Sequence, residues 1–164
     1  MHFPGRFATG ENILAAQVMG ADLAYIGSAF IATEEANAHR DYEQMIVNSS
    51  AEGVVYTNLF TGVHGNYLKP SIVRAGLDPD NLPVSNPSAM NFGERREGSN
   101  VKPWRDIWGS GQGIGAVAEV VPAGALISRL RDEYREAAGR MARLSATASF
   151  AVDELSHSRA AAAI

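Results

Sequence analysis

The sequence has no cysteine, a small deficit of positive charge and no long hydrophobic run. The absence of cysteine from 164 residues excludes disulfide bonds, thiolate metal sites and cysteine nucleophiles. The 14 Lys and Arg residues are outnumbered by 18 Asp and Glu residues, so the chain lacks the basic field that attracts nucleic acid or an anionic membrane. No apolar run approaches the roughly 20 residues that cross a bilayer. We therefore expect neither a nucleic-acid partner nor a membrane partner.

The start of the chain and the placement of its ionisable residues exclude two further classes. Residues 1–6 lack the apolar core of a secretion signal, so we expect a cytoplasmic protein. No group of His, Asp and Glu residues has the spacing of metal ligands, so no metal is expected. The composition, 46% hydrophobic and 20% charged, is that of a globular domain. The 16 glycines gather at junctions where a backbone turns tightly or approaches a ligand.

The N-terminal part of the chain has the pattern of a (β/α) fold. Thr9 is a good N-cap for a helix with apolar residues at helical spacing, and Gly20 stands where such a helix ends. Residues 21–26 form a short, mostly apolar run that stops at Gly27 and Ser28. Such a run is typical of a buried strand in a parallel sheet. Helix, buried strand and glycine turn together predict an α/β fold.

The middle of the chain alternates helices with short extended pieces. Thr33 is predicted to cap a second helix, with Glu34 and Glu35 in its first turn, that runs through about residue 49. Residues 53–57 are predicted to be extended, and a short helix over residues 71–75 is predicted to end at Gly76. Residues 84–103 are the least regular stretch, and a loop of this length inside a domain is usually functional or mobile.

The last third contains a glycine-rich loop over residues 109–115 and the strongest helix of the chain. Pro122 opens this helix, and its apolar stripe lies opposite a charged face. The stripe consists of Leu126, Ile127, Leu130, Tyr134, Ala137, Met141 and Leu144. From residue 145 onward the chain is Ala-rich and weakly patterned, so we expect it to fray. The predicted organisation is one domain over residues 1–144 and a tail over residues 145–164.

The turn at Gly27 and Ser28 is a candidate phosphate site. A phosphate needs convergent backbone N–H donors, a glycine that lets the backbone approach, and often a hydroxyl group. The loop after a barrel strand supplies all three. The loop over residues 109–115 is not a P-loop, because no Gly-Lys-Ser/Thr follows, and it lacks the strand and acidic residue of a dinucleotide-binding unit. A hinge before the last helix is the other interpretation of that loop.

Several segments share the pattern of one known family. They are Ala8-Thr9-Gly10, residues 17–22, residues 25–35, Tyr56-Thr57-Asn58, and residues 109–112 with the closing helix. Together they resemble the nitronate monooxygenase family, also called 2-nitropropane dioxygenase, whose members are FMN-dependent TIM-barrel enzymes. The resemblance covers about residues 5–140 and is most specific over residues 20–35. It implies FMN as cofactor, and a small nitronate or nitroalkane together with O₂ as substrates.

The resemblance also implies where the cofactor binds. The FMN phosphate would be held by Gly5 and by the backbone of Tyr25, Ile26, Gly27 and Ser28. Gln112 would lie near the rim of the flavin. Arg6 stands where the family usually has a second glycine. Its backbone N–H is retained, and its positive charge suits an anion.

Most of the family's barrel has no counterpart in this sequence. A TIM barrel needs about 250 residues, whereas only the last two βα units are recognisable here, followed by helical and loop additions. The predicted fold is therefore a partial TIM (β/α)8 barrel, which would associate with itself or with a separate N-terminal half. In the family, the catalytic base belongs to an upstream His-Gly-Gly motif that this sequence lacks, so no catalytic residue is assigned.

Three questions stay open at this point. His64 lies in a glycine-rich loop with Tyr67 and Lys69, and these three side chains are candidates to line the substrate or move a proton. A flavin-dependent enoyl reductase on the same barrel would share the phosphate turns. A non-catalytic remnant, with unpaired strand edges and an open apolar face, is the alternative outside the enzymes.

Overall fold

The computed structural model describes residues 7–85 and 103–161, with side chains over residues 7–85 and 105–147. The helices are α1 (Gly10–Val18), α2 (Ser28–Ile31), α3 (Arg40–Val47), α4 (Lys69–Arg74), α5 (Pro103–Asp106) and α6 (Ala123–Ala161). Two short 3₁₀ helices, η1 (Ala51–Gly53) and η2 (Gln112–Ala116), and two strands, β1 (Val54–Thr57) and β2 (Gly65–Leu68), complete the described elements. Within these ranges, no helix is both long and apolar enough to cross a membrane.

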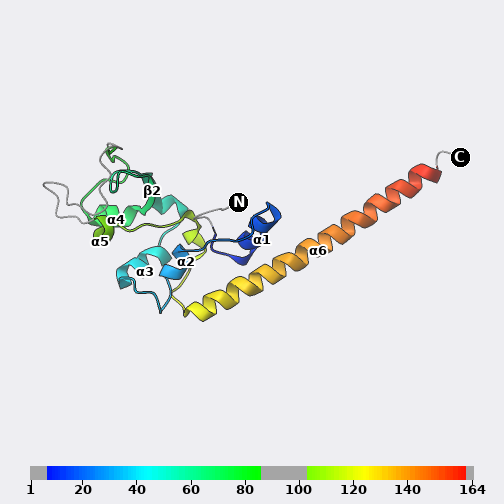
Figure 1. Cartoon of the computed structure of the whole chain (residues 1–164), viewed down its shortest axis with the longest axis horizontal. Helices are drawn as coiled ribbons and strands as arrows, with labels where there is room; N and C mark the ends of the chain where they lie inside the picture. The colour runs from blue at the N-terminus through cyan, green and yellow to red at the C-terminus, as the bar shows by residue number, and fades with distance from the viewer. Residues whose placement is uncertain (1–6, 86–102, 162–164) are drawn as a thin grey trace.

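Most elements form one lobe, from which a single long helix projects. In Figure 1 the helices α2 to α5 and the strands gather in this lobe, α1 lies between the lobe and α6, and α6 runs away from the lobe to the C-terminus. The two strands pair antiparallel, with Val54 opposite Leu68 and Thr57 opposite Gly65. The structure therefore combines helices with a small antiparallel hairpin.

The first helix forms as the sequence predicts. The Thr9 hydroxyl accepts a hydrogen bond from the Asn12 N–H at 3.4 Å, which makes Thr9 the N-cap of α1. Gly20 follows the helix with φ +90°, a conformation that glycine adopts without steric cost. Both termini of α1 are thus determined by local signals.

The predicted buried strand at residues 21–26 is wrong. This segment has no regular secondary structure, and the side chains of Leu23 and Tyr25 are 79% and 64% exposed. A parallel strand is stable only when a neighbouring strand supplies its hydrogen bonds. Among the described residues, the one parallel contact is an isolated bridge between Thr33 and Val121, and residues 21–26 belong to no strand.

The second helix begins later than predicted. Thr33 does not cap it; the Thr33 hydroxyl instead donates to the Phe30 carbonyl at 2.8 Å. The cap of α3 is His39, whose Nδ1 accepts from the Asp41 N–H at 3.1 Å. The delay has a tertiary cause, because the Glu34 N–H donates to the Val121 carbonyl at 3.1 Å and the Glu35 carboxylate accepts from the Ala123 N–H at 2.7 Å.

The hairpin and the helix after it agree with the sequence pattern. The extended piece predicted at residues 53–57 is β1. The short helix predicted at residues 71–75 is α4, which starts two residues earlier because Pro70 is favoured in a first helical turn. Gly76 follows it with φ +79°. The long irregular stretch predicted at residues 84–103 lies almost entirely outside the described residues.

Two apolar clusters hold the lobe together. The larger cluster joins α2, α3, η2 and the start of α6 and contains Ala29, Ala32, Ile46, Leu68, Trp108, Ile114, Val117, Leu126 and Leu130 among others. The smaller cluster lies under the hairpin and contains Leu59, Phe60, Ile72 and Ile107. Residues 107 and 108 are adjacent in sequence and belong to different clusters, so the segment before the glycine-rich loop connects the two halves of the core.

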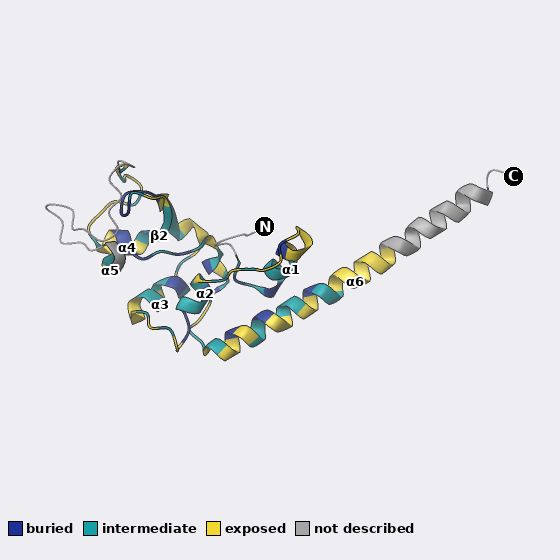
Figure 2. Cartoon of the chain, in the orientation of Figure 1, coloured by how far each residue is buried: buried dark blue, intermediate teal, exposed yellow. Residues whose placement is uncertain are grey.

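The long helix α6 buries only part of its predicted apolar stripe. Leu126, Leu130 and Ala137 are buried, whereas Met141 and Leu144 are 51% and 64% exposed, as Figure 2 shows by the exposed colour along the middle of the helix. The backbone is helical to Ala161, and fraying of the tail after residue 144 stays a prediction. Alanine, the best helix former, is abundant there.

Helix α1 packs against α6 through a glycine. A Cβ atom built on Gly10 would lie 2.2 Å from the Tyr134 nitrogen and 2.3 Å from the Leu130 carbonyl oxygen. Its N–H donates to the Glu133 carboxylate at 2.7 Å. At the other end of α1, the Tyr134 hydroxyl donates to the Gln17 side-chain oxygen at 2.7 Å. The two helices therefore approach backbone to backbone at Gly10.

Candidate functional site

The two glycine-containing loops singled out in the sequence meet in the structure. The Gly111 N–H donates to the Ser28 hydroxyl oxygen at 2.7 Å, across 83 positions of sequence. Ser28 begins α2 and Gly111 precedes η2, so the contact joins two element starts. Because the Ser28 oxygen accepts this bond, the proton of the same hydroxyl is left to be donated to a ligand.

A cavity of about 440 Å³ opens beside this contact. Its volume is in the usual range for small-molecule and cofactor sites. Its lining mixes glycine backbone, hydroxyl groups and apolar side chains, and none of the described side chains that line it is charged. The lining residues are Gly27, Ser28, Ile31, Tyr42, Thr61, Tyr67, Ile107, Trp108, Gly109 and Ser110.

Tyr42 connects helix α3 to the glycine-rich loop. Its hydroxyl donates to the Gly109 carbonyl, and its ring stacks on Trp108 with centroids 4.9 Å apart. Burial raises the pKa of the Tyr42 phenol above its ordinary value, because a buried phenolate would lose its hydration. Tyr42 is therefore a protonated donor at neutral pH, and it holds Gly109 in place at the cavity wall.

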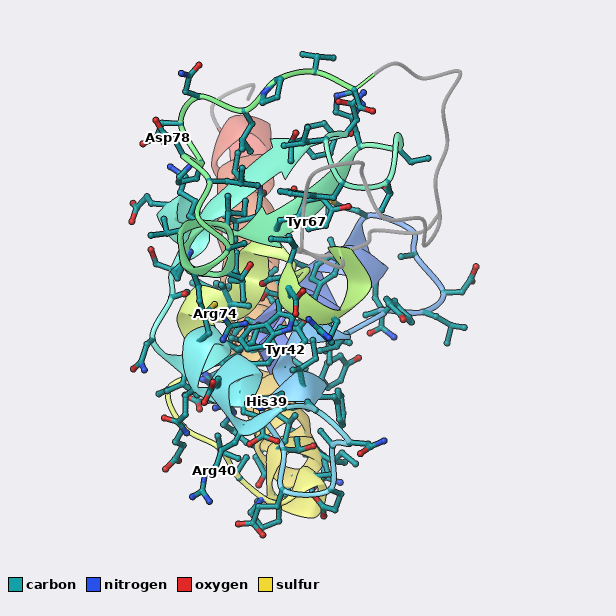
Figure 3. All side chains as sticks on the ribbon, turned by 90° about the vertical axis from the view of Figure 1, so that its left-hand side faces the viewer. His39, Arg40, Tyr42, Tyr67, Arg74 and Asp78 are labelled. Carbon is teal, nitrogen blue, oxygen red and sulfur yellow. The ribbon has the colours of Figure 1, made fainter. Side chains whose placement is uncertain are left out.

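Trp108 contacts residues of several elements around the site. Its backbone N–H donates to the buried Ser71 hydroxyl, and its indole N–H donates to the Arg105 carbonyl, both at 3.0 Å. The Arg74 guanidinium lies 3.8 Å from the centroid of the Trp108 ring, a cation–π contact. Figure 3 shows Arg74, Tyr42 and His39 gathered in one part of the molecule, and each of them contacts Trp108.

The raised pKa of Tyr42 gives a testable dependence of stability on pH. In the unfolded chain the Tyr42 phenol ionises near its ordinary pKa of 10.0, below its pKa in the folded chain. The contribution of the buried Tyr42 to the free energy of unfolding is therefore fully present below pH 10.0 and is lost as the pH rises through the folded pKa. Tyr42→Phe should remove this part of the alkaline loss and should lower the free energy of unfolding at neutral pH by about 1–2 kcal/mol, because the Gly109 carbonyl loses its donor. Urea denaturation at a series of pH values measures both effects.

The exposed Tyr56 provides the control for that experiment. Its side chain is 67% exposed, so Tyr56→Phe should leave the alkaline profile of the native chain unchanged. If Tyr42→Phe and Tyr56→Phe gave the same profile, the proposed position of Tyr42 as a buried donor would be incorrect.

The structure brings together some of the predicted site residues but not others. Gly27 and Ser28 line the cavity. Tyr25 and Ile26 do not belong to its lining, and Gln112 is exposed at the start of η2, one residue beyond the Gly111 contact. Gly5 and Arg6 lie outside the described residues.

The candidates His64, Tyr67 and Lys69 lie in the hairpin loop, in β2 and at the start of α4, respectively. Tyr67 lines the cavity, and its hydroxyl lies 3.4 Å from the Thr61 hydroxyl. His64 is exposed and stacks on Tyr56 with centroids 5.0 Å apart. Lys69 pairs with Asp80 at 3.0 Å. Only Tyr67 of the three thus reaches the cavity.

Tyr42, Thr61 and Trp108 line the cavity but were not candidates from the sequence. Tyr42 fits the apolar face of its helix, where an aromatic residue predicts core packing. Trp108 directly precedes the glycine-rich loop, and a large aromatic residue in that position is the signal that could have been used. Among the residues that the structure describes, no three His, Asp or Glu side chains form a group able to hold a metal ion.

Comparison with known proteins identifies the family. The sequence profile described as Nitronate monooxygenase matches residues 4–133. The chain belongs to the nitronate monooxygenase family. The matched range includes Gly27, Ser28 and the loop over residues 109–115, so both loops that meet at the cavity are part of the family's own sequence.

Individual relatives agree with this assignment at low identity. The chain is 26% identical to a probable nitronate monooxygenase of Staphylococcus haemolyticus over 66% of its length. It is 26% identical to a nitronate monooxygenase of Paraburkholderia phytofirmans over 80% of its length, and 28% identical to a probable nitronate monooxygenase of Bacillus subtilis over 75%. The matches cover 31%, 37% and 36% of these relatives, so the chain spans about a third of their length.

Solved structures show the same fold relationship. A nitroalkane oxidase from Streptomyces ansochromogenes aligns with a TM-score of 0.61 at 26% identity, over 83% of this chain and 39% of that protein. FabK from Thermotoga maritima aligns with a TM-score of 0.60 at 20% identity, over 85% of this chain and 45% of that protein. These neighbours are of the TIM-barrel type. The α/β class is thus supported, whereas the described residues do not form barrel strands of their own.

Proposed function

We propose that this chain forms the FMN-phosphate end of an enzyme of nitronate monooxygenase type, which oxidises alkyl nitronates with O₂. Family membership and the relatives described as nitronate monooxygenases support the reaction class. The observation that carries the proposal is the contact between Ser28 and Gly111 at the edge of the cavity. It places a hydroxyl donor and two glycine-rich backbones around one ligand-sized space.

The residues of the cavity suit the chemistry of FMN. A phosphate group needs N–H and O–H donors and no neighbouring carboxylate. Among the described residues, the lining has hydroxyls and glycine backbone and no acidic side chain. The flat flavin ring needs apolar and aromatic walls, which Ile31, Ile107 and Trp108 provide. A Cβ on Gly27 would meet only Tyr25, at 3.6 Å, so the backbone at Gly27 is open to a ligand.

Each residue of the cavity would have a defined task. FMN, when bound, would supply the electron-transfer chemistry. Ser28 would donate its hydroxyl proton to the phosphate while its oxygen remains fixed by the Gly111 N–H. Tyr42 would hold the Gly109 carbonyl away from the ligand by donating to it. Trp108 and Ile107 would exclude water from one side of the cavity. The group that takes a proton from the substrate is not assigned to this chain.

A flavin-dependent enoyl reductase is the second candidate function. The likeness to FabK, at 20% identity, shows the fold alone and does not distinguish the two reactions. The curated relatives described as nitronate monooxygenases, at 26% and 28% identity, favour the first. Separate measurement of nitronate-dependent O₂ uptake and of NAD(P)H-dependent enoyl-thioester reduction would distinguish the two.

The phosphate assignment is tested by comparing FMN with riboflavin, which lacks the phosphate. Purified chain should bind FMN, as measured by quenching of flavin fluorescence, and Ser28→Ala should weaken FMN binding about fivefold to tenfold, the effect of one lost hydrogen bond of roughly 1–1.5 kcal/mol. Riboflavin binding should be the same in both proteins. Ser50→Ala, which alters an exposed serine bonded to Glu52, should change neither affinity.

Two results would count against the proposal. An equal loss of FMN and riboflavin affinity in Ser28→Ala would mean that Ser28 shapes the cavity without contacting the phosphate. An absence of FMN binding by the folded native chain would support the non-catalytic remnant. Because the chain spans about a third of its relatives, we expect turnover of nitronate only after the remainder of a barrel is supplied.

A further inference from the structure

The distal part of α6 extends beyond both the lobe and the family match. The match ends at residue 133, whereas α6 continues to Ala161. Toward its C-terminal half, α6 contacts α1 through the ion pair of Arg140 with Glu11 at 3.7 Å. Figure 1 shows the helix continuing from there away from every other element. At 1.5 Å per residue, the 21 positions between Arg140 and Ala161 extend for about 30 Å.

An uninterrupted heptad pattern runs along this helix. Apolar residues recur at alternating steps of three and four at nine successive positions, which we call the α6 seam: Ile127, Leu130, Tyr134, Ala137, Met141, Leu144, Ala148, Ala151 and Leu155. A pattern of this spacing over four heptads is the signature of a coiled coil. The pattern crosses the end of the family match without a break, so it does not serve only to pack α6 on the lobe.

The α6 seam is covered over only part of its length. Ile127 at its start is 55% exposed, whereas Leu130 and Ala137 are 7% and 5% exposed where α1 packs on α6. Met141 and Leu144 continue the same face and are 51% and 64% exposed. Most of the stability of a helix in a protein comes from packing its apolar face. Within the described side chains, the seam is therefore packed between residues 130 and 137 and is largely exposed at residues 141 and 144.

We propose that residues 141–155 of α6 pair antiparallel with the same segment of a second copy of this chain. With the pair centred between residues 144 and 148, the position of Leu144 falls opposite that of Ala148 of the partner subunit, and the position of Met141 falls opposite that of Ala151 of the partner subunit. Each layer then combines one large and one small residue, so the layers have similar volume.

The antiparallel direction also matches the charges that border the seam. Arg140, which also pairs with Glu11 and Glu136 of its own chain, occupies the position just before Met141. Glu154 occupies the equivalent position two heptads later. In this register Arg140 lies opposite Glu154 of the partner subunit, at both ends of the pair. A parallel pair would instead place alanine against alanine in the two consecutive layers 148 and 151, and would leave gaps there. Packing and charge thus favour the same arrangement.

The oligomeric state of the full chain tests the proposal. Sedimentation velocity from micromolar to near-millimolar protein should show the native chain approaching twice the monomer mass. The double variant Met141→Glu and Leu144→Glu should stay monomeric. The double variant Ala142→Glu and Ala146→Glu, which adds the same charge to the same exposed stretch off the seam, should dimerise like the native chain.

The outcomes separate folding from association. Circular dichroism checks that both variants keep the helix, and the milder Leu144→Ala, which retains helix propensity, should also shift the equilibrium toward monomer. A native chain that is monomeric at every concentration would overturn the proposal. So would a seam variant that associates as strongly as the off-seam variant.

Cross-linking tests the direction, since the native chain has no cysteine. Leu144→Cys and Ala148→Cys, mixed and mildly oxidised, should give a disulfide-linked heterodimer, because these two positions face each other in the antiparallel pair. Either variant alone should give little cross-linked product. Efficient linking of Leu144→Cys to itself would show a parallel pair and would refute the antiparallel register.

Discussion

Gly10→Ala is expected to separate α1 from α6 and to lower the free energy of unfolding by about 3 kcal/mol or more. The added Cβ would lie 2.2 Å and 2.3 Å from backbone atoms of α6, and a backbone cannot move aside as a flexible side chain can. The higher helix propensity of alanine over glycine would stabilise the helix by at most about 1 kcal/mol. The steric clash is larger, so the net effect of the substitution is destabilising. Urea denaturation, followed by hydrogen exchange of residues 10–18, measures the effect.

Gly124 offers a matched control for this substitution. It lies in the first turn of α6, as Gly10 lies in the first turn of α1, and a Cβ on Gly124 would meet nothing within 4 Å. Gly124→Ala should be neutral or stabilising. If Gly10→Ala were equally harmless, the close approach of the two helices at Gly10 would have to be abandoned.

Trp108→Ala is expected to cost about 3–5 kcal/mol of stability, the usual range for removal of a large buried aromatic side chain. Trp108 is 7% exposed and belongs to the larger core cluster. The substitution also removes the ring on which Tyr42 stacks and over which Arg74 lies. Thermal and urea unfolding would measure the loss, and flavin binding should fall with it, because the same ring lines the cavity.

Two further substitutions show whether the loss of stability in Trp108→Ala comes from the buried position of the Trp108 ring. Trp108→Phe keeps an aromatic ring in the core and should recover more than half of the lost stability. Tyr56→Ala removes an aromatic ring that is 67% exposed and should cost less than about 1 kcal/mol. Equal losses for Tyr56→Ala and Trp108→Ala would contradict the central role of Trp108.

The elements that the sequence predicts well are those with local causes. Thr9 caps α1 through its own side chain, and Gly20 and Gly76 take the positive φ that glycine permits. These features depend on a few neighbouring residues, so they can be recognised in the sequence. Gly27 and Ser28 line the cavity, but Gly27 has φ −108°, and their role in holding a phosphate stays a prediction.

The wrong or missing predictions have tertiary causes. Residues 21–26 have the composition of a buried strand, but burial depends on neighbouring strands that the described residues do not supply. Thr33 is a suitable cap, yet the contacts of Glu34 and Glu35 with the start of α6 delay the helix to Arg40. The contact between Ser28 and Gly111 joins residues that are 83 positions apart in the sequence, so no local sequence pattern could predict it.

The clamp between the segment after α2 and the start of α6 has a mechanical consequence. Thr33 forms a β-bridge with Val121, and the Glu35 carboxylate accepts a hydrogen bond from the Ala123 N–H. The segment that follows α2 at the cavity is therefore attached directly to the start of α6. The 39 residues of α6 form a helix about 58 Å long. A tilt of a few degrees about this start would displace the far end of α6 by several ångströms, and the contacts of α1 with α6 at Gly10 and Arg140 oppose such a tilt.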